Sequence, residues 1–326
     1  MIKKFLILIA VVFSSLSFAQ QGSSSPYSFY GIGSLKFKGT VENQSMGGLS
    51  VYSDSIHVNL RNPASFAGKN LKSFNNEARP VKYTIGGSHS EVKLSSGSQT
   101  DKSSTSGLDY LAIAIPLGKF GAGFGLLPYS SVGYKLQSRD TDDVLQYKYR
   151  GEGGLNKVFL GFGYQLTNDL RFGIDASYNF GNIINTNIAY GYNSEGQLLQ
   201  YQSRETNRSD LGGLTYNFGL IFSKLIKPKL EVMASATYTP SSELTSSNTR
   251  AYSTIVIDPL TQQEFTINDL EVDLSPFNLS TTQLTLPSKS SFGLGVGNPR
   301  KWFAGVEYTF LEASQFSNRL QYVCLN

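Results

Sequence analysis

Large apolar side chains fall on alternate residues in five segments of the chain. The segments are residues 158–166, 170–180, 214–222, 230–238 and 302–310. In the first segment, for example, Leu160 and Phe162 flank Gly161. Because successive side chains on a strand point to opposite faces, each segment has one apolar face and one face that is mostly small or polar. Long strands with this pattern are typical of a membrane-spanning β-barrel.

The connections between the predicted strands alternate between short and long. The short ones, rich in Gly, Pro, Asn and Asp, are residues 117–119, 167–169, 226–229 and 297–300. The long ones are residues 137–144, 191–208 and 241–285. Outer-membrane barrels have short periplasmic turns and longer extracellular loops, so the short set is expected to face the periplasm.

Aromatic side chains mark the ends of the apolar face. Phe172 and Phe180 are eight positions apart, as are Trp302 and Phe310. Eight steps of roughly 3.3 Å, shortened by strand tilt, span about 20 Å, which is close to the apolar band of about 25 Å in membrane barrels. A soluble β-sandwich also alternates but does not require this spacing. The pattern therefore predicts an all-β fold, an antiparallel transmembrane β-barrel.

The chain divides into three zones. Residues 1–19 read as a signal peptide, with a basic start at Lys3 and Lys4, an apolar run and a cleavage site at Ser17-Phe18-Ala19. Residues 20–72 have no sustained period, and residues 73–326 carry the strands of the predicted barrel. This organisation predicts export through the amino-terminal signal peptide and a location in the cell outer membrane.

Composition adds few constraints. The formal charge is +4, and removal of Lys3 and Lys4 with the signal leaves +2, which is too small to suggest a nucleic-acid partner. Mean hydropathy is −0.18, a value typical of a soluble protein. This value does not exclude a membrane barrel, because half of the residues of each barrel strand face the lumen and are polar. Cys324 is the only cysteine, so a disulfide within the chain is excluded.

Glycines gather on the small face of the predicted strands. They include Gly121, Gly123, Gly125, Gly161, Gly163, Gly173, Gly181, Gly219, Gly293, Gly295 and Gly305. Glycine inside a strand often marks the close approach of another backbone. Two interpretations remain open: relief of crowding where the wall bends, and room for a luminal plug formed by residues 20–72.

Three short strings in residues 20–72 carry a family resemblance. They are Asn43-Gln44-Ser45-Met46-Gly47-Gly48, Val51-Tyr52-Ser53-Asp54-Ser55 and Asn62-Pro63-Ala64-Ser65. Together they resemble the amino-terminal hatch of the FadL/TodX family of outer-membrane transport proteins for hydrophobic compounds. The resemblance implies a FadL-type barrel whose plug contains Asn62, Pro63 and Ala64, with Asp54 and Asn59 on its approach, as a ligand gate.

The same resemblance implies a function. Members of the family take up long-chain fatty acids or aromatic hydrocarbons by passive diffusion, with no cofactor. The expected partners are therefore outer-membrane lipid and a hydrophobic small molecule. A related PorV-like branch serves protein secretion, so the alternative is a non-transporting barrel that acts as an accessory or scaffold for secretion-system proteins.

The number of strands departs from that family. About nine strands can be counted, against fourteen in the family's barrel, and bacterial single-chain barrels are even-numbered and closed. The sequence therefore suggests a barrel that is incomplete, or truncated, at its carboxyl end. The alternative is that the count misses strands near residues 254–257 and 265–267.

The remaining chemistry is sparse. Arg171, Asp175, Glu231 and Glu307 are predicted to line the lumen, where plug anchoring and hydration are favoured over direct ligand contact. His89 lies between two serines, but neighbouring strand residues face opposite sides and cannot pair as base and nucleophile. The histidines and the single cysteine have no metal-ligand spacing. The sequence thus predicts a protein that is not an enzyme and that holds no metal.

Overall fold

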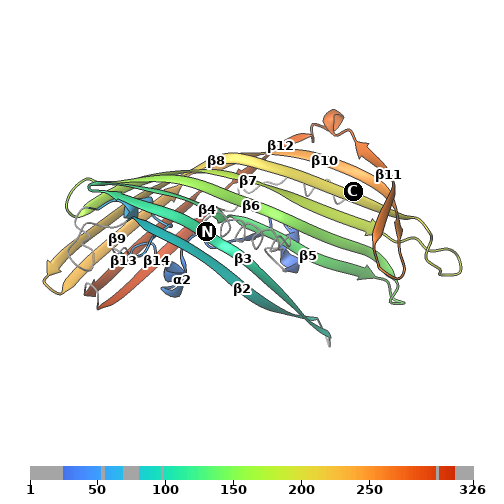
Figure 1. Ribbon diagram of the computed structural model, residues 1–326, viewed down its shortest axis with the longest axis horizontal. Coiled ribbons are helices and arrows are strands. Elements are labelled where there is room, and N and C mark those ends of the chain that lie inside the picture. Colours follow the sequence, from blue (N-terminus) through green and yellow to red (C-terminus); the bar gives the residue numbers. More distant parts are fainter. Residues whose placement is uncertain (1–24, 53–55, 69–80, 97–98, 299–300, 313–326) are drawn as a thin grey trace, which may run out of the picture.

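One large antiparallel sheet dominates the computed structural model, which describes residues 25–52, 56–68, 81–96, 99–298 and 301–312 (Figure 1). The strands are β1 Ser34–Leu35, β2 Lys82–Ser96, β3 Gln99–Leu117, β4 Phe120–Pro128, β5 Ser130–Arg139, β6 Leu145–Gln165, β7 Leu170–Ala189, β8 Gln202–Lys227, β9 Leu230–Thr239, β10 Ser242–Ile257, β11 Glu264–Val272, β12 Thr281–Leu286, β13 Lys289–Asn298 and β14 Trp302–Leu311. The helical turns are η1 Pro26–Phe29, α2 Val41–Ser45, η2 Pro63–Phe66 and η3 Ser275–Phe277. The prediction of an all-β antiparallel fold is confirmed.

Nine strands follow one another across the sheet in the order β14-β13-β9-β8-β7-β6-β4-β3-β2. The other five branch from this path: β1 pairs with β5, β5 with β6, and β10 with β8, β11 and β12. The count of nine was therefore too low, since the sheet has fourteen strands, and residues 254–257 and 265–267 do lie in β10 and β11. Within the described residues β2 and β14 each pair on one side only, so the ladder is not closed.

The two faces of the sheet alternate as the sequence predicts. In β6, Leu160 is 48% exposed and Phe162 is 53% exposed, whereas Phe159, Gly161 and Gly163 are buried. The same alternation runs along β7 and β8. The large apolar side chains of these strands thus lie on the outside of the curved sheet, and the glycines lie on the inside.

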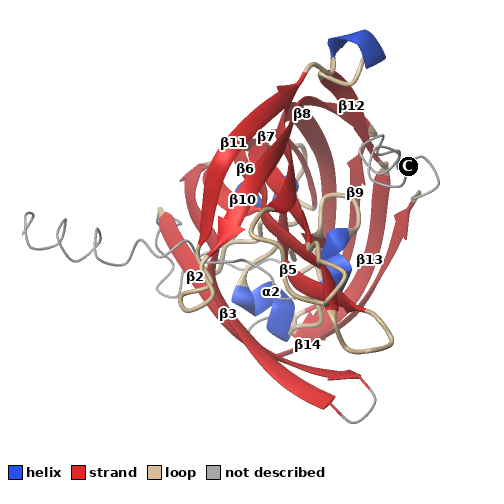
Figure 2. Cartoon of the chain, turned by 90° about the vertical axis from the view of Figure 1, so that its right-hand side faces the viewer, coloured by secondary structure: helices blue, strands red, loops and turns tan. Residues whose placement is uncertain are grey.

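The sheet curves around residues 25–52 and 56–68, which we call the inner segment (Figure 2). Its helix α2 is capped by Thr40, whose hydroxyl accepts from the Asn43 amide while the Asn43 side chain accepts from the Thr40 amide. None of the described helices has the length and apolar character needed to cross a membrane. The predicted signal peptide, Asp54 and the boundary at residue 72 lie outside the described residues.

Two apolar clusters fill the concave side. In one, Ile32 packs with buried side chains of β5, β6, β7, β8, β10 and β12, among them Leu155, Ile183 and Leu244. In the other, Val58, Leu60 and Phe66 pack against β3, β4 and β6. The inner face thus carries two apolar clusters where Ile32, Val58, Leu60 and Phe66 contact it, in addition to the small and polar residues that the strand pattern predicted.

Candidate functional site

The site is built around η2, the short turn that begins after Asn62. The Asn62 Oδ1 accepts a hydrogen bond from the Ala64 amide at 3.0 Å, and Pro63 occupies the first turn, where its missing N–H costs nothing. The Asn62 Nδ2 donates to the carbonyl of Leu220 on β8 at 3.2 Å. Asn62 is fully buried, as is Ala64. The turn is therefore fixed both within itself and against the sheet.

Glycines of four strands form a bed beneath this turn. A Cβ placed on any of them would come closer than 3.0 Å to an atom of residues 62–67, a distance that real Cβ atoms essentially never show. They are Gly121 and Gly123 on β4, Gly161 and Gly163 on β6, Gly173 on β7 and Gly219 on β8. These glycines thus leave room for the backbone of η2 and the ring of Phe66 to lie directly on the sheet.

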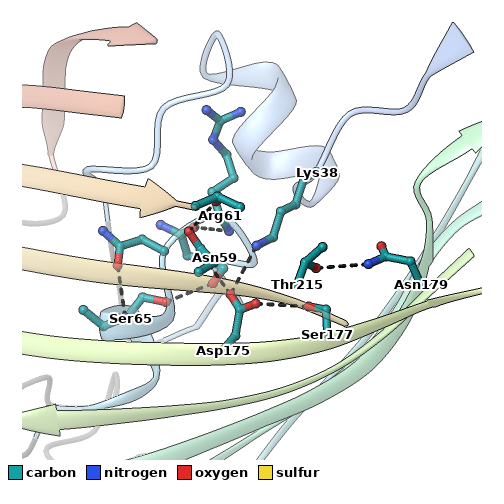
Figure 3. A network of polar contacts seen from close by, with 12 residues as sticks. Lys38, Asn59, Arg61, Ser65, Asp175, Ser177, Asn179 and Thr215 are labelled. Atoms are coloured by element: carbon teal, nitrogen blue, oxygen red, sulfur yellow. Dashed lines mark hydrogen bonds and ion pairs between the residues drawn. The ribbon is translucent and has the colours of Figure 1, made fainter. Parts of the chain in front are cut away.

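Asp175 on β7 collects three donors on this inner face (Figure 3). Its carboxylate accepts from Lys38 Nζ at 3.2 Å, from Asn217 Nδ2 at 2.8 Å and from Ser177 Oγ at 3.1 Å. The Asp175 side chain is 5% exposed, whereas that of Lys38 is 28% exposed. A buried carboxylate requires such compensation because isolated burial of a charge is costly. Asp175 therefore joins the inner segment to β7 and β8.

Glu307 on β14 makes the second ionic contact with the inner segment. Its Oε1 lies 2.7 Å from Arg61 Nη2, and its Oε2 accepts from the backbone N–H of Ser50. The Arg61 guanidinium also lies over the ring of Phe37, 5.3 Å from its centroid. One carboxylate on β14 thus binds two separated parts of the inner segment.

Asn59 holds those two parts together. Its Nδ2 donates to the carbonyls of Ser50 at 2.8 Å and Tyr52 at 2.9 Å, and its Oδ1 accepts from the Arg61 amide at 3.0 Å. The Asn59 carbonyl accepts from Ser65 Oγ at 2.9 Å (Figure 3). Every polar group of this buried side chain therefore has a partner, and Asn59 joins residues 50, 52, 61 and 65 of the inner segment.

The four residues that were predicted to line the lumen separate into two pairs. Asp175 and Glu307 contact the inner segment directly, as described above. Arg171 is buried on β7 and donates to Ser223 Oγ on β8 at 3.3 Å. Glu231 lies on β9 near the short turns, within electrostatic reach of Arg171, and among the described contacts none joins it to the inner segment.

Sequence reasoning missed the partners on the inner segment, namely Lys38, Ser50 and Arg61. Residues 20–72 have no periodicity, so nothing in the sequence distinguished these side chains from solvated ones. The strand residues could be found because they are charged or glycine at positions that alternate with large apolar side chains. Together, the contacts of the inner segment with the strands link distant parts of the chain.

Within the described residues, no group of three or more His, Cys, Asp or Glu side chains could hold a metal ion.

The whole chain was compared with families of known proteins. A family model named BamG matches residues 1–324. No curated protein and no solved structure matches the chain.

This match corrects the predicted relationship. BamG is a family distinct from FadL/TodX, so the resemblance of residues 43–65 to a FadL hatch was wrong. The predicted uptake of hydrophobic compounds and the PorV-like secretion role are wrong for the same reason, and a family of fourteen-stranded barrels no longer sets the expected number of strands. BamG is an outer-membrane-associated family, which agrees with the predicted association with the outer membrane.

Proposed function

Because the chain belongs to the BamG family, we propose that it takes part in the assembly of outer-membrane proteins, as a protein partner of the assembly machinery. The observation that carries the proposal is the family match, which extends over residues 1–324 and so includes both the strands and the inner segment. The role is one of binding and support, without a catalytic step. The described contacts of Asp175, Glu307 and Asn59 fit this role, because each of them joins one part of the chain to another.

As part of the same proposal, the sheet lies in the outer membrane. Its outer face carries large exposed apolar side chains along successive strands, including Phe124 at 53%, Phe162 at 53% and Leu294 at 62% exposure. Exposed apolar patches of this extent in water mark an interaction surface or a membrane contact. In the proposal the sheet is the wall of a membrane-embedded β-barrel, and the inner segment fills its interior as a plug. Export then depends on residues 1–19 acting as a signal peptide.

Affinity purification from membranes tests the assembly role. A tag inserted beside Leu260, which is 92% exposed in the turn between β10 and β11, avoids both faces of the sheet. Components of the outer-membrane assembly machinery should co-purify after mild detergent extraction. The matched control is an abundant outer-membrane barrel of the same cells, tagged in a loop of similar length. If the assembly components are recovered equally from both strains, or from neither, the proposal fails.

A further inference from the structure

The two ends of the nine-strand path, β2 and β14, run in the same direction. Every neighbouring pair along the nine-strand path is antiparallel, so the first strand, β2, and the ninth, β14, point the same way. A direct ladder between them would be the one parallel pairing in an antiparallel sheet. Among the described residues no backbone pairing joins them, whereas the inner segment contacts both.

The inner segment reaches the β2 edge at two points. Lys82, on β2, donates from its Nζ to the carbonyl of His57 at 2.6 Å, and Lys82 is only 8% exposed. On the adjacent strand β3, the Tyr110 hydroxyl accepts from the backbone N–H of Val41 at 3.1 Å. Tyr110 is also buried, at 3% exposure. These contacts attach the inner segment to both strands of the β2–β3 hairpin.

The same segment reaches the β14 edge through residues 50–52 and 61. Glu307 of β14 binds Arg61 and the Ser50 amide, and the rings of Tyr52 and Phe303 lie 4.9 Å apart. Val51 is fully buried. It packs against Gly293 of β13, since a Cβ on that glycine would lie 3.1 Å from the Val51 Cβ. The segment therefore contacts both strands of the β13–β14 hairpin.

We propose that the inner segment is an internal tie between β2 and β14, the two ends of the nine-strand path, and that Glu307 is the point at which the tie holds β14. Among the residues that the structure describes, β14 is joined to the rest of the sheet by one backbone ladder, to β13, and by its side-chain contacts with the inner segment. Loss of the Glu307 carboxylate removes an ion pair and a charge-assisted backbone hydrogen bond together. The β13–β14 hairpin then moves relative to β2 while the strands between them keep their places.

Distance measurements between spin labels test this directly. Labels at Tyr83 on β2 and Tyr308 on β14, which are 77% and 63% exposed, are placed in a chain whose Cys324 is replaced by Ser. Glu307→Gln should broaden or shift the distance distribution between these labels. A reference pair at Phe124 on β4 and Leu220 on β8 should keep its distribution in the same variant. Hydrogen exchange of the β14 amides should rise at least about tenfold, which corresponds to about 1.4 kcal/mol.

Glu91→Gln is the matched control. It removes the same charge from an exposed ion pair, Lys102–Glu91 at 3.7 Å, that joins strands already connected by a ladder. Glu91→Gln should change neither the Tyr83–Tyr308 distance distribution nor the hydrogen exchange of the β14 amides. A second variant, Tyr110→Phe, removes only the acceptor for Val41, so it tests the other end of the tie without a buried charge. Unchanged Tyr83–Tyr308 distances in both Glu307→Gln and Tyr110→Phe would overturn the proposal.

Discussion

The side-chain amide of Asn62 donates to the backbone carbonyl of Leu220 at 3.2 Å, across 158 residues of sequence. The other atom of the same amide group, Oδ1, caps the turn that begins at Pro63. Because Gly219 lies beside Leu220 and has no Cβ, the Asn62 side chain can lie flat against β8. One side chain therefore determines both the shape of η2 and its place on the sheet.

Asn62→Ala should destabilise the folded protein by about 1–2 kcal/mol, because the cap and the bond to Leu220 are lost together. Chemical unfolding of the detergent-solubilised protein measures the effect. Asn156→Ala, at an exposed position of β6, is the control and should stay within about 0.5 kcal/mol. Equal losses in the two variants would show that Asn62 has no special role.

Gly173→Ala should destabilise by about 1–3 kcal/mol, since the new methyl group would collide with the backbone of Pro63 and Ala64. The inner segment should also become more sensitive to limited proteolysis. Gly107→Ala on β3 is the matched control, because a Cβ there meets nothing within 4 Å. A Gly173→Ala protein as stable and as resistant as Gly107→Ala would contradict the described position of η2.

Asp175→Asn should cost about 1.5–3 kcal/mol, since a buried charged acceptor of three hydrogen bonds is replaced by a neutral amide. Lys38→Met should cost less, because the Lys38 side chain is partly exposed and solvent screens its charge. Thermal unfolding of both variants gives the order. A larger loss in Lys38→Met than in Asp175→Asn would show that the ion pair, and not the buried carboxylate, dominates.

Leu160→Arg tests whether the outer face meets lipid. Leu160 is 48% exposed near the middle of the apolar stretch of β6, so an arginine there should cost about 2–4 kcal/mol if it lies at the bilayer midplane. Refolding into lipid vesicles from urea measures this free energy. Ser194→Arg, in the exposed connection after β7, should cost about 0–1 kcal/mol. A harmless Leu160→Arg would argue that the outer face is not in lipid.

The sequence was informative where the backbone imposes a period. Strand alternation identified the outer face of β6, β7 and β8 correctly, because an extended chain leaves each side chain only two directions. Alternation also placed Phe159 on the inner face, where the structure buries it, but it could not show that Phe159 and Leu155 belong to packed apolar clusters, since the partners Phe66 and Ile32 come from a segment without a period. Lys38 and Arg61 escaped notice for the same reason.

The family was misread from a short string for a physical reason. Asn62 and Pro63 are the residues that any chain favours at a cap and at the first position of a turn. The string Asn-Pro-Ala therefore indicates only a capped turn, which unrelated families share. The contact of Asn62 with Leu220, by contrast, joins residues 158 positions apart and depends on the whole fold.

The rate at which newly made outer-membrane proteins reach their folded form tests the central claim most directly. Cells depleted of this protein are pulse-labelled, and the folded fraction of a major outer-membrane barrel is followed by its altered gel mobility before heating. The account predicts slower conversion to the folded form on depletion, with recovery when the wild-type chain is supplied again. Unchanged conversion rates in depleted cells, with the protein shown to be absent, would contradict a role in outer-membrane protein assembly.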